Sequence, residues 1–136
     1  MYQTNQEIMQ RFVGEVINNR CLGVIEEIIH PDYVYRTPGE ELHGRQALRD
    51  LFAAYNVAFP DLCVSIDDQV YTDDKAVVLF TLTATHENDF MGIGATGKPV
   101  NINGMICSRI ENGQIIEEWE LLDQLNLFRQ LGIVSI

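Results

Sequence analysis

The sequence predicts an α+β protein, with helices gathered in the first half of the chain and an antiparallel sheet in the second. Apolar residues recur at helical spacing over the first 60 residues and at alternate positions from residue 64 onward. Asn112-Gly113 stands between two apolar runs and is the pair that a tight hairpin turn prefers. Such a sheet must curl to cover its apolar face with the helices, which leaves a cavity at its open end for a small ligand.

Length and composition favour a single domain over residues 1–136. The 136 residues are 46% hydrophobic, which is enough for one core and too little for two domains. The 20 acidic residues against 9 basic residues give a formal net charge of -11, which repels nucleic acid and anionic membranes. No leader segment and no apolar run of bilayer length is visible. We therefore expect a cytoplasmic protein with no nucleic-acid partner and no membrane partner.

The cysteines and histidines are too scattered to predict a disulfide frame or a metal site. The three cysteines form no CxxC pair, and the three histidines form no HxxxH pair. Gly92, Gly94 and Gly97 match the spacing of a dinucleotide fingerprint, but they join two strands instead of opening a helix. We expect neither a metal nor a cofactor.

Three helices and one short strand account for the first 60 residues. The first helix begins at a capping box whose first residue is Thr4, and it ends near Asn19. A shorter second helix stops before Pro31, because the residue that precedes a proline is excluded from helical geometry. A strand is expected at residues 33–37, followed by a Pro-Gly turn and a polar loop. The third helix is stopped by Pro60.

Four strands and a terminal helix account for the rest of the chain. The strands are expected at residues 64–70, 75–86, 100–110 and 115–122. The second of them has one apolar face that ends in His86. The glycine-bearing segment Glu87 to Lys98 is a loop long enough to serve a function. Asp123 is expected to cap the last helix, and Gly132 to end it.

Several segments occur together in the order and spacing of a known family. They are His30-Pro31-Asp32-Tyr33, Phe59-Pro60-Asp61-Leu62, His86 followed by Phe90-Met91-Gly92-Ile93, Thr96-Gly97-Lys98, and Arg109-Ile110-Glu111-Asn112-Gly113 with Trp119. Through these segments nearly the whole chain resembles the SnoaL-like polyketide cyclase family. The resemblance implies the fold of nuclear transport factor two, a cystatin-like cone of curved antiparallel sheet with helices packed on its concave side. That fold hosts isomerases, cyclases, hydrolases, dehydratases and binding modules.

The resemblance also implies where a catalytic acid would stand. In cyclases of this family, a carboxylate on the last strand acts as acid and base in an intramolecular aldol closure, beside a histidine on the neighbouring strand. Carried over without gaps, the carboxylate falls on Glu120 and the histidine position falls on Ile106. Ketosteroid isomerase, a second relative, has its acid just before a proline of the first strand, where this chain has Thr37. By this resemblance, the chain keeps the cyclase acid and lacks the cyclase histidine. Steroid isomerisation is disfavoured.

Strand parity separates the acidic residues around Trp119. Residues of alternate parity form two faces, Ile116, Glu118, Glu120 and Leu122 on one, and Ile115, Glu117, Trp119 and Leu121 on the other. Apolar content alone would put the Trp119 face in the core, whereas the resemblance turns Glu120 into the cavity. Both readings hold if Trp119 lies on a convex face that packs against a second copy. The resemblance likewise implies a homodimer.

Two residues are candidates for catalysis, Glu120 as a proton shuttle and His86 as the group that orients or polarises an oxygen. The alternatives are a solvated strand acid and a rim histidine satisfied by the backbone. A carboxylate desolvated beside an apolar group would have a raised pKa and could exchange a proton near neutral pH. The candidate substrate-binding residues are Glu118, Ile106, Tyr35, Tyr55, Phe90 and Met91.

Two functions are consistent with these residues. The first is a cofactor-independent polyketide or ester cyclase, or a related isomerase, that acts on a small, largely apolar carbonyl compound. Its loop Glu87 to Lys98 would close the mouth of the cavity. The second is a non-catalytic module for small-ligand binding or dimerisation, which the apolar residue Ile106 at the family's histidine position favours.

Overall fold

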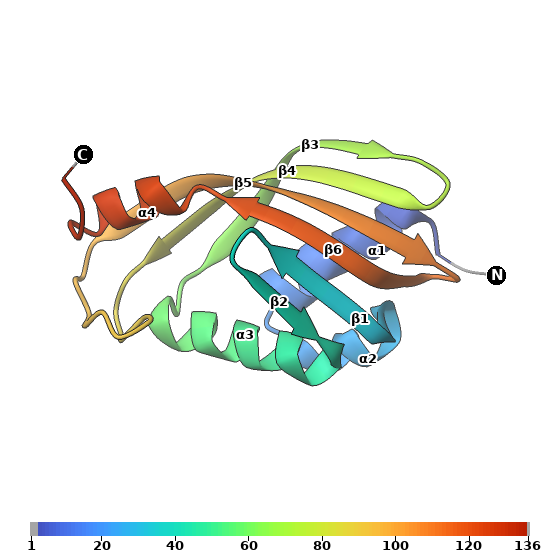
Figure 1. The fold of residues 1–136 in the computed structure, drawn as a ribbon, viewed down its shortest axis with the longest axis horizontal. Helices are drawn as coiled ribbons and strands as arrows, with labels where there is room; N and C mark the ends of the chain where they lie inside the picture. Colours follow the sequence, from blue (N-terminus) through green and yellow to red (C-terminus); the bar gives the residue numbers. More distant parts are fainter. Residues whose placement is uncertain (1–2, 136) are drawn as a thin grey trace.

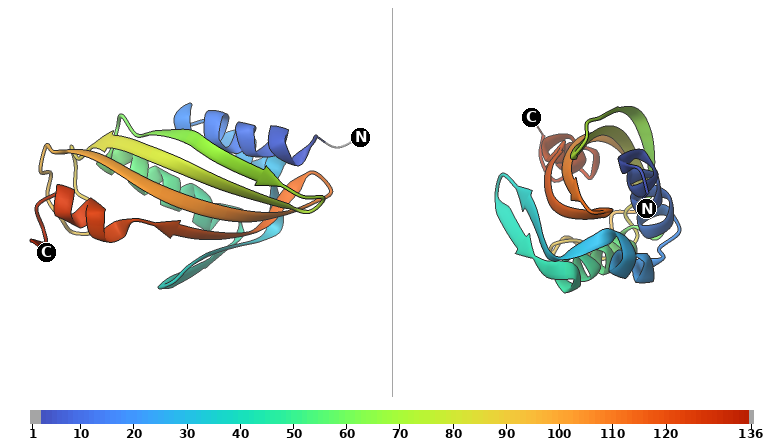
Figure 2. Two further views of the ribbon diagram at one scale, coloured as in Figure 1. Left: turned by 90° about the horizontal axis from the view of Figure 1, so that it is seen from above. Right: turned by 90° about the vertical axis from the view of Figure 1, so that its right-hand side faces the viewer.

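The computed structural model describes residues 3–135 and has a six-stranded curved sheet, with the helices of residues 5–58 packed along one side (Figure 1). The elements are α1 (Asn5–Arg11), η1 (Phe12–Asn18), η2 (Leu22–Val24), α2 (Ile25–Ile28), β1 (Ile29–Thr37), β2 (Glu40–His43), α3 (Gly44–Ala58), β3 (Cys63–Tyr71), β4 (Lys75–Thr85), β5 (Pro99–Glu111), β6 (Gln114–Leu122) and α4 (Gln124–Gln130). The strand order is β2-β1-β6-β5-β4-β3. Seen end on, the sheet curls part of the way around the helices (Figure 2). The predicted α+β class and cone-like sheet are confirmed.

Local capping and turn signals are confirmed where they were expected. Thr4 forms both hydrogen bonds of its capping box at the start of α1. Asp123 accepts a hydrogen bond from the backbone N–H of Asn126 at 3.2 Å and so caps α4. Asn112 and Gly113 both have positive φ, 51° and 77°, as a tight hairpin turn between β5 and β6 requires.

The polar segment expected to be a loop after the Pro-Gly turn is in fact a strand, β2. It pairs with β1 in an antiparallel hairpin, in which Thr37 lies opposite Glu40 and Val34 lies opposite His43. Three of its four residues are exposed, because it lies at an edge of the sheet. Backbone pairing at an edge needs no buried side chains, and charged residues are common there. Apolar periodicity therefore gave no sign of it.

The sheet contains one parallel pair, β1 with β6, within an otherwise antiparallel arrangement. Its register sets Tyr35 opposite Glu118 and Arg36 opposite Trp119. Side chains of the first strand thus meet those of the last, although they lie far apart in the sequence. This pairing builds the polar part of the site described below.

A β-bulge in β6 corrects the face predicted for Ile115. Arg109 pairs with Glu117 while Ile110 pairs with Ile115, so Ile116 is an extra residue in the ladder. Ile115 is consequently fully buried on the same side as Glu118, instead of sharing the outer face with Trp119. Beyond the bulge the alternation holds as predicted.

Trp119 lies on the outer face of the sheet, with 52% of its surface exposed. The guanidinium carbon of Arg36 lies 5.6 Å from the centre of its ring. The inner face packs against α1, η1, α2 and α3 and forms the core. None of the helices within residues 3–135 combines the length and the apolar character needed to span a membrane.

Candidate functional site

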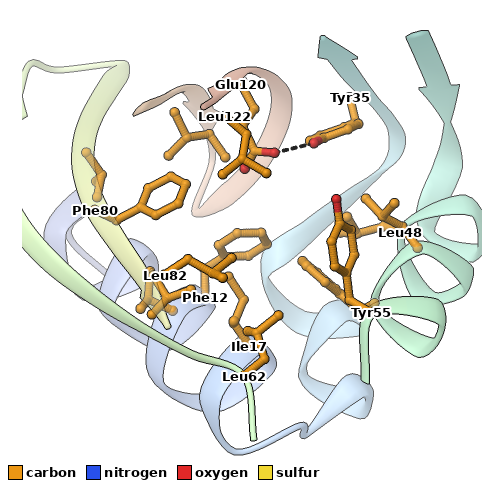
Figure 3. Close-up of a pocket in the computed structure, with 16 residues that line it drawn as sticks. Phe12, Ile17, Tyr35, Leu48, Tyr55, Leu62, Phe80, Leu82, Glu120 and Leu122 are labelled. Carbon is orange, nitrogen blue, oxygen red and sulfur yellow. Dashed lines mark hydrogen bonds between the residues drawn. The ribbon is translucent and has the colours of Figure 1, made fainter. Parts of the chain in front are cut away.

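An apolar cavity of about 70 Å³ lies between the inner face of the sheet and the helices (Figure 3). η1 and α3 form one wall, and β4, β5 and β6 form the other. The lining residues include Phe12, Ile17, Leu48, Leu51, Phe52, Leu62, Phe80, Leu82, Ile106 and Leu122. Three side chains bring polar atoms into this lining, Tyr35, Tyr55 and Glu120. The cavity therefore offers one carboxyl group and two hydroxyl groups in apolar surroundings.

The strand registers align the polar residues in two adjacent rows. In the first row, Ser108 of β5 lies opposite Glu118 of β6, and the hydroxyl of Tyr33 on β1 reaches the same carboxyl group. In the second row, Ile106 lies opposite Glu120, and Tyr35 reaches that carboxyl group. The two rows differ at one position, because the first has a serine where the second has an isoleucine.

Glu118 is a fully buried acid whose two oxygens both accept hydrogen bonds. The hydroxyl of Tyr33 donates to Oε1 at 2.6 Å, and the hydroxyl of Ser108 donates to Oε2 at 2.5 Å. The pKa of Glu118 is raised to about 7, mainly by burial; the hydrogen bonds from Ser108 and Tyr33 oppose this rise, and the negative charge of Glu120 adds to it. Glu118 is therefore an interior carboxyl group with a hydrogen bond to each oxygen and a pKa near neutrality.

Glu120 is partly buried and retains one free oxygen. The hydroxyl of Tyr35 donates to its Oε1 at 2.5 Å. No group within residues 3–135 donates to its Oε2, since the residue across the sheet is Ile106. Burial raises the pKa of Glu120, while the hydrogen bond from Tyr35 lowers it. The carboxyl group can thus hold or release a proton closer to neutral pH than an exposed glutamate.

The two tyrosine hydroxyls of the cavity are permanent donors at ordinary pH. Burial, followed by the charge of Glu120, raises the pKa of Tyr35 far above its usual value. Burial, the charge of Glu120 and the charge of Glu40 raise the pKa of Tyr55 to about 12. In Figure 3 the hydroxyl of Tyr55 points toward the space beside the Tyr35–Glu120 pair. A ligand oxygen in that space could accept a hydrogen bond from it.

His86 is fully buried but is not among the residues that line this cavity. Its Nδ1 accepts a hydrogen bond from the backbone N–H of Thr96 at 3.3 Å and lies 3.0 Å from the Thr96 hydroxyl. Its Nε2 has no hydrogen-bond partner among residues 3–135. The ring of Phe59 lies 5.5 Å from the histidine ring, and the ring of Phe90 lies 6.5 Å from it. The catalytic role of His86 stays a prediction.

The remaining predicted residues divide between the cavity and the loop. Ile106, Tyr35 and Tyr55 line the cavity together with Glu120, and Glu118 lies behind it. Phe90 is buried against Tyr55, with ring centres 5.4 Å apart, and does not line the cavity. Met91, 73% exposed, lies in the loop between β4 and β5. This loop is attached to the end of α3 by hydrogen bonds from Glu87 and Asn88 to the carbonyl oxygen of Ala58.

Two residues that meet Glu118, Tyr33 and Ser108, were not among the predicted site residues. Each stands two positions from a residue that was singled out, Tyr35 and Ile106 respectively. A spacing of two places strand residues on one face, so parity carried the signal. The pairing of β1 with β6 was needed to show that these residues meet Glu118.

The arrangement suits proton transfer in a small apolar space. One carboxyl with a raised pKa has an unoccupied oxygen, and a neighbouring hydroxyl can donate to a developing negative charge. Within the described residues, no three His, Cys, Asp or Glu side chains gather in a group able to hold a metal ion.

Comparisons with solved structures agree with this fold. The chain superposes on TsrD from Streptomyces laurentii with a TM-score of 0.86, at 27% identity, over 95% of each chain. IdmH from Streptomyces antibioticus, a proposed polyketide cyclase, gives a TM-score of 0.84 at 27% identity, over 96% of this chain and 99% of that one. AclR from Streptomyces galilaeus, a proposed hydroxylase, gives 0.85 at 25% identity, over 96% and 86%.

No curated protein matches the chain in a sequence comparison. The sequence model of the family described as SnoaL-like polyketide cyclase matches residues 7–131, which include every element from α1 to α4 except the first two residues of α1. The chain belongs to the SnoaL-like polyketide cyclase family.

Proposed function

We propose that the protein is a cofactor-independent enzyme that cyclises or isomerises a small, largely apolar carbonyl compound by proton transfer. The observation that carries the proposal is the free Oε2 of Glu120 in an apolar cavity. Glu118, by contrast, has both oxygens occupied by hydroxyl groups and is unavailable to a ligand. Membership of a cyclase family and the likeness to a proposed cyclase support the same class of reaction.

In this mechanism Oε2 of Glu120 takes a proton from the carbon next to a carbonyl group. The electron pair of the broken C–H bond forms a carbon–carbon double bond, the π pair of the carbonyl group moves to its oxygen, and the hydroxyl of Tyr55 donates a hydrogen bond to that enolate oxygen. In a cyclisation the enolate carbon then attacks a second carbonyl of the same molecule. Glu120 returns its proton to the new alkoxide, so the enzyme ends as it began. In an isomerisation the proton returns to a different carbon.

Replacement of Glu120 by glutamine should remove the proposed proton transfer. The variant keeps the shape and the hydrogen bond from Tyr35 but cannot accept a proton, so catalysed exchange should fall by about 10²–10⁴-fold. The measurement is the rate at which wild type and Glu120→Gln catalyse deuterium exchange at the carbon beside the carbonyl group of small neutral ketones. NMR in D₂O follows the exchange.

Glu117→Gln is the matched control, because Glu117 lies on the same strand but pairs with Arg36 on the other side of the sheet. It should exchange protons at the wild-type rate. A folded Glu120→Gln variant with full exchange activity would refute the role of Glu120. Binding without exchange in the wild type would favour the alternative function, a non-catalytic binding module.

We further propose that the outer face of the sheet pairs two copies of the chain. Its exposed apolar side chains, here called the outer patch, are Val70, Leu79, Met105, Trp119 and Leu121. Leu79, Met105 and Leu121 lie side by side across three strands. On β4, Lys75 lies beyond one end of this patch, and Thr81, which donates to Asp67, lies beyond the other. A two-fold axis that lies between the two outer faces and runs across the strands would set the basic end of each copy against the acidic end of its partner.

A further inference from the structure

The cavity adjoins a second and larger hollow, here called the vestibule. The vestibule has a volume of about 270 Å³, against about 70 Å³ for the cavity. The turn between β1 and β2 and the end of β6 contribute to its lining. Five residues line both spaces, Tyr35, Leu51, Tyr55, Glu120 and Leu122. The carboxyl group of Glu120 therefore stands at the boundary between a small chamber and a large one.

The inner chamber has room for a compact apolar group only. One water-sized site needs roughly 10–15 Å³ of such volume, so 70 Å³ corresponds to about five non-hydrogen atoms. Away from the boundary its lining is aliphatic and aromatic, with Phe80, Leu82 and Leu62 among the residues (Figure 3). A short or branched alkyl group fits these limits, whereas a fused ring system does not.

The vestibule is polar and carries negative charge. The hydroxyl of Thr37 and the amide of Gln124 offer hydrogen bonds, and Glu40 supplies a carboxylate. Glu40 is among the residues that line this space, and its charge contributes to the raised pKa of Tyr55. Among the residues that line the vestibule within residues 3–135, none is Lys, Arg or His. An anionic group placed here would be repelled without compensation.

We infer that the substrate is a neutral or cationic amphipathic carbonyl compound in two parts. A compact alkyl group of about five non-hydrogen atoms occupies the inner chamber, and a larger polar part occupies the vestibule. The carbonyl group between them lies at Glu120. The inference rests on the proposed function for the carbonyl group and adds the polarity, size and orientation of the substrate. The substrate enters the vestibule at the β1–β2 turn, not at the loop of residues 87–98.

The test uses 4-oxo amides, in which an alkyl group, a ketone, two methylenes and an amide are followed by a short polar end. The alkyl group runs from methyl to octyl, and the end is hydroxyethyl, aminoethyl or carboxymethyl. Dissociation constants are measured calorimetrically with the full chain at pH 7.5. Affinity should rise about fourfold per methylene up to butyl or pentyl and then level off. The anionic carboxymethyl probes should bind about tenfold more weakly than the neutral ones.

Two variants assign these effects to the two chambers. Leu82→Phe, which adds three carbons inside, should shorten the best alkyl group by about three carbons, and thermal melting checks that it folds. Glu40→Lys, at an exposed position, should tighten binding of the carboxymethyl probes about tenfold. Glu87→Lys is the matched control, since it makes the same charge change on the loop and should leave all affinities unchanged.

Affinity that ignores alkyl length, or that keeps rising to octyl, would overturn the inner-chamber assignment. Equal binding of the anionic and neutral ends, equal effects of Glu40→Lys and Glu87→Lys, or no binding at millimolar concentration would overturn the inference as a whole. Deuterium exchange on the same probes reports the proposed function separately. Length-limited binding without exchange contradicts only the catalytic proposal, and exchange without a length limit contradicts only the present inference.

Discussion

Two glutamates of one strand differ in availability because of a single residue on the neighbouring strand. Ser108 supplies the second hydrogen bond to Glu118, whereas Ile106 supplies none to Glu120. A carboxyl with both oxygens satisfied is a structural group, and one with a free oxygen can exchange a proton with a ligand. The apolar replacement at the family's histidine position therefore does not remove the acid. It leaves one oxygen of that acid unoccupied.

The burial of Glu118 makes stability depend on pH. Its folded-state pKa of about 7 lies above the value of about 4.5 expected in the unfolded chain. Between these values the unfolded state loses the proton and the folded state keeps it, so stability falls as pH rises. From pH 4.5 to 7, the free energy of unfolding of wild type should fall by about 3 kcal/mol relative to that of Glu118→Gln. At lower pH the difference between the two proteins should change little.

The measurement is the free energy of unfolding in urea at pH 4, 5, 6 and 7, for wild type and Glu118→Gln in parallel. Taking the difference removes the titration of groups that both proteins share. Glu117→Gln changes a half-buried acid on the outer face of the same strand, and it should give a curve parallel to wild type. Parallel curves for Glu118→Gln as well would show that the buried glutamate does not titrate in this range.

The glycine at position 104 of β5 has a steric explanation. Gly104 lies directly opposite Phe80, whose ring covers the glycine. A Cβ atom added at residue 104 would lie 2.3 Å from Cζ of Phe80. Phe80 is itself buried and lines the cavity, so its ring cannot swing into solvent. The missing side chain on β5 thus makes room for part of the cavity wall on β4.

We therefore expect Gly104→Ala to destabilise the protein by about 1–3 kcal/mol, as overpacking of a core does. Displacement of the Phe80 ring into the cavity should also weaken ligand binding. Urea unfolding and calorimetry measure the two effects. Gly14→Ala is the control, because nothing lies within 4 Å of an added Cβ there, and it should be neutral or stabilising. Equal stability of the two variants would contradict the steric argument.

Elements with local signals could be predicted from the sequence, and those fixed by tertiary pairing could not. The capping box at Thr4 and the turn at Asn112 depend on neighbouring residues alone, and both formed as expected. β2 and the bulge at Ile116 depend on which strand lies alongside, so apolar periodicity missed both. The same holds in the site. Glu120 could be placed by resemblance, whereas the contact between Tyr33 and Glu118 required the parallel pairing of β1 with β6.

At the scale of the whole molecule, the outer patch is the surface through which we expect two copies to associate. Trp119 and Leu121 expose 52% and 60% of their surfaces at the centre of the sheet's outer side. Several large apolar side chains that lie side by side in water favour burial against a partner. The inner cavity and the outer patch share β6, so a partner on the outer face would also hold the strand that carries Glu120.

We expect wild type to sediment as a particle of twice the chain mass and Trp119→Arg to shift toward the monomer, because a charge would then be buried between the copies. Analytical ultracentrifugation over a range of concentrations measures this. Leu125→Arg is the control, since Leu125 is 49% exposed on α4 but lies outside the outer patch. A monomeric wild type, or an unchanged dimer in Trp119→Arg, would exclude this interface.

The parallel pairing of β1 with β6 also bears on the order in which the chain folds. β3, β4, β5 and β6 follow one another as antiparallel neighbours, so each pairs across a connection of no more than 13 residues, the longest being residues 86–98. The hydrogen bonds from Tyr33 and Tyr35 to the two glutamates each span 85 residues, and closing so long a loop is slow. We expect the four-strand meander to form first and β1 to dock last. Until β1 docks, both acids lack their tyrosine partners. Docking of β1 buries Glu118, whose pKa is raised to about 7, so at alkaline pH this step must bury a charged carboxylate. Alkaline pH should therefore slow the final folding step more than the earlier ones, as stopped-flow refolding over a range of pH would measure.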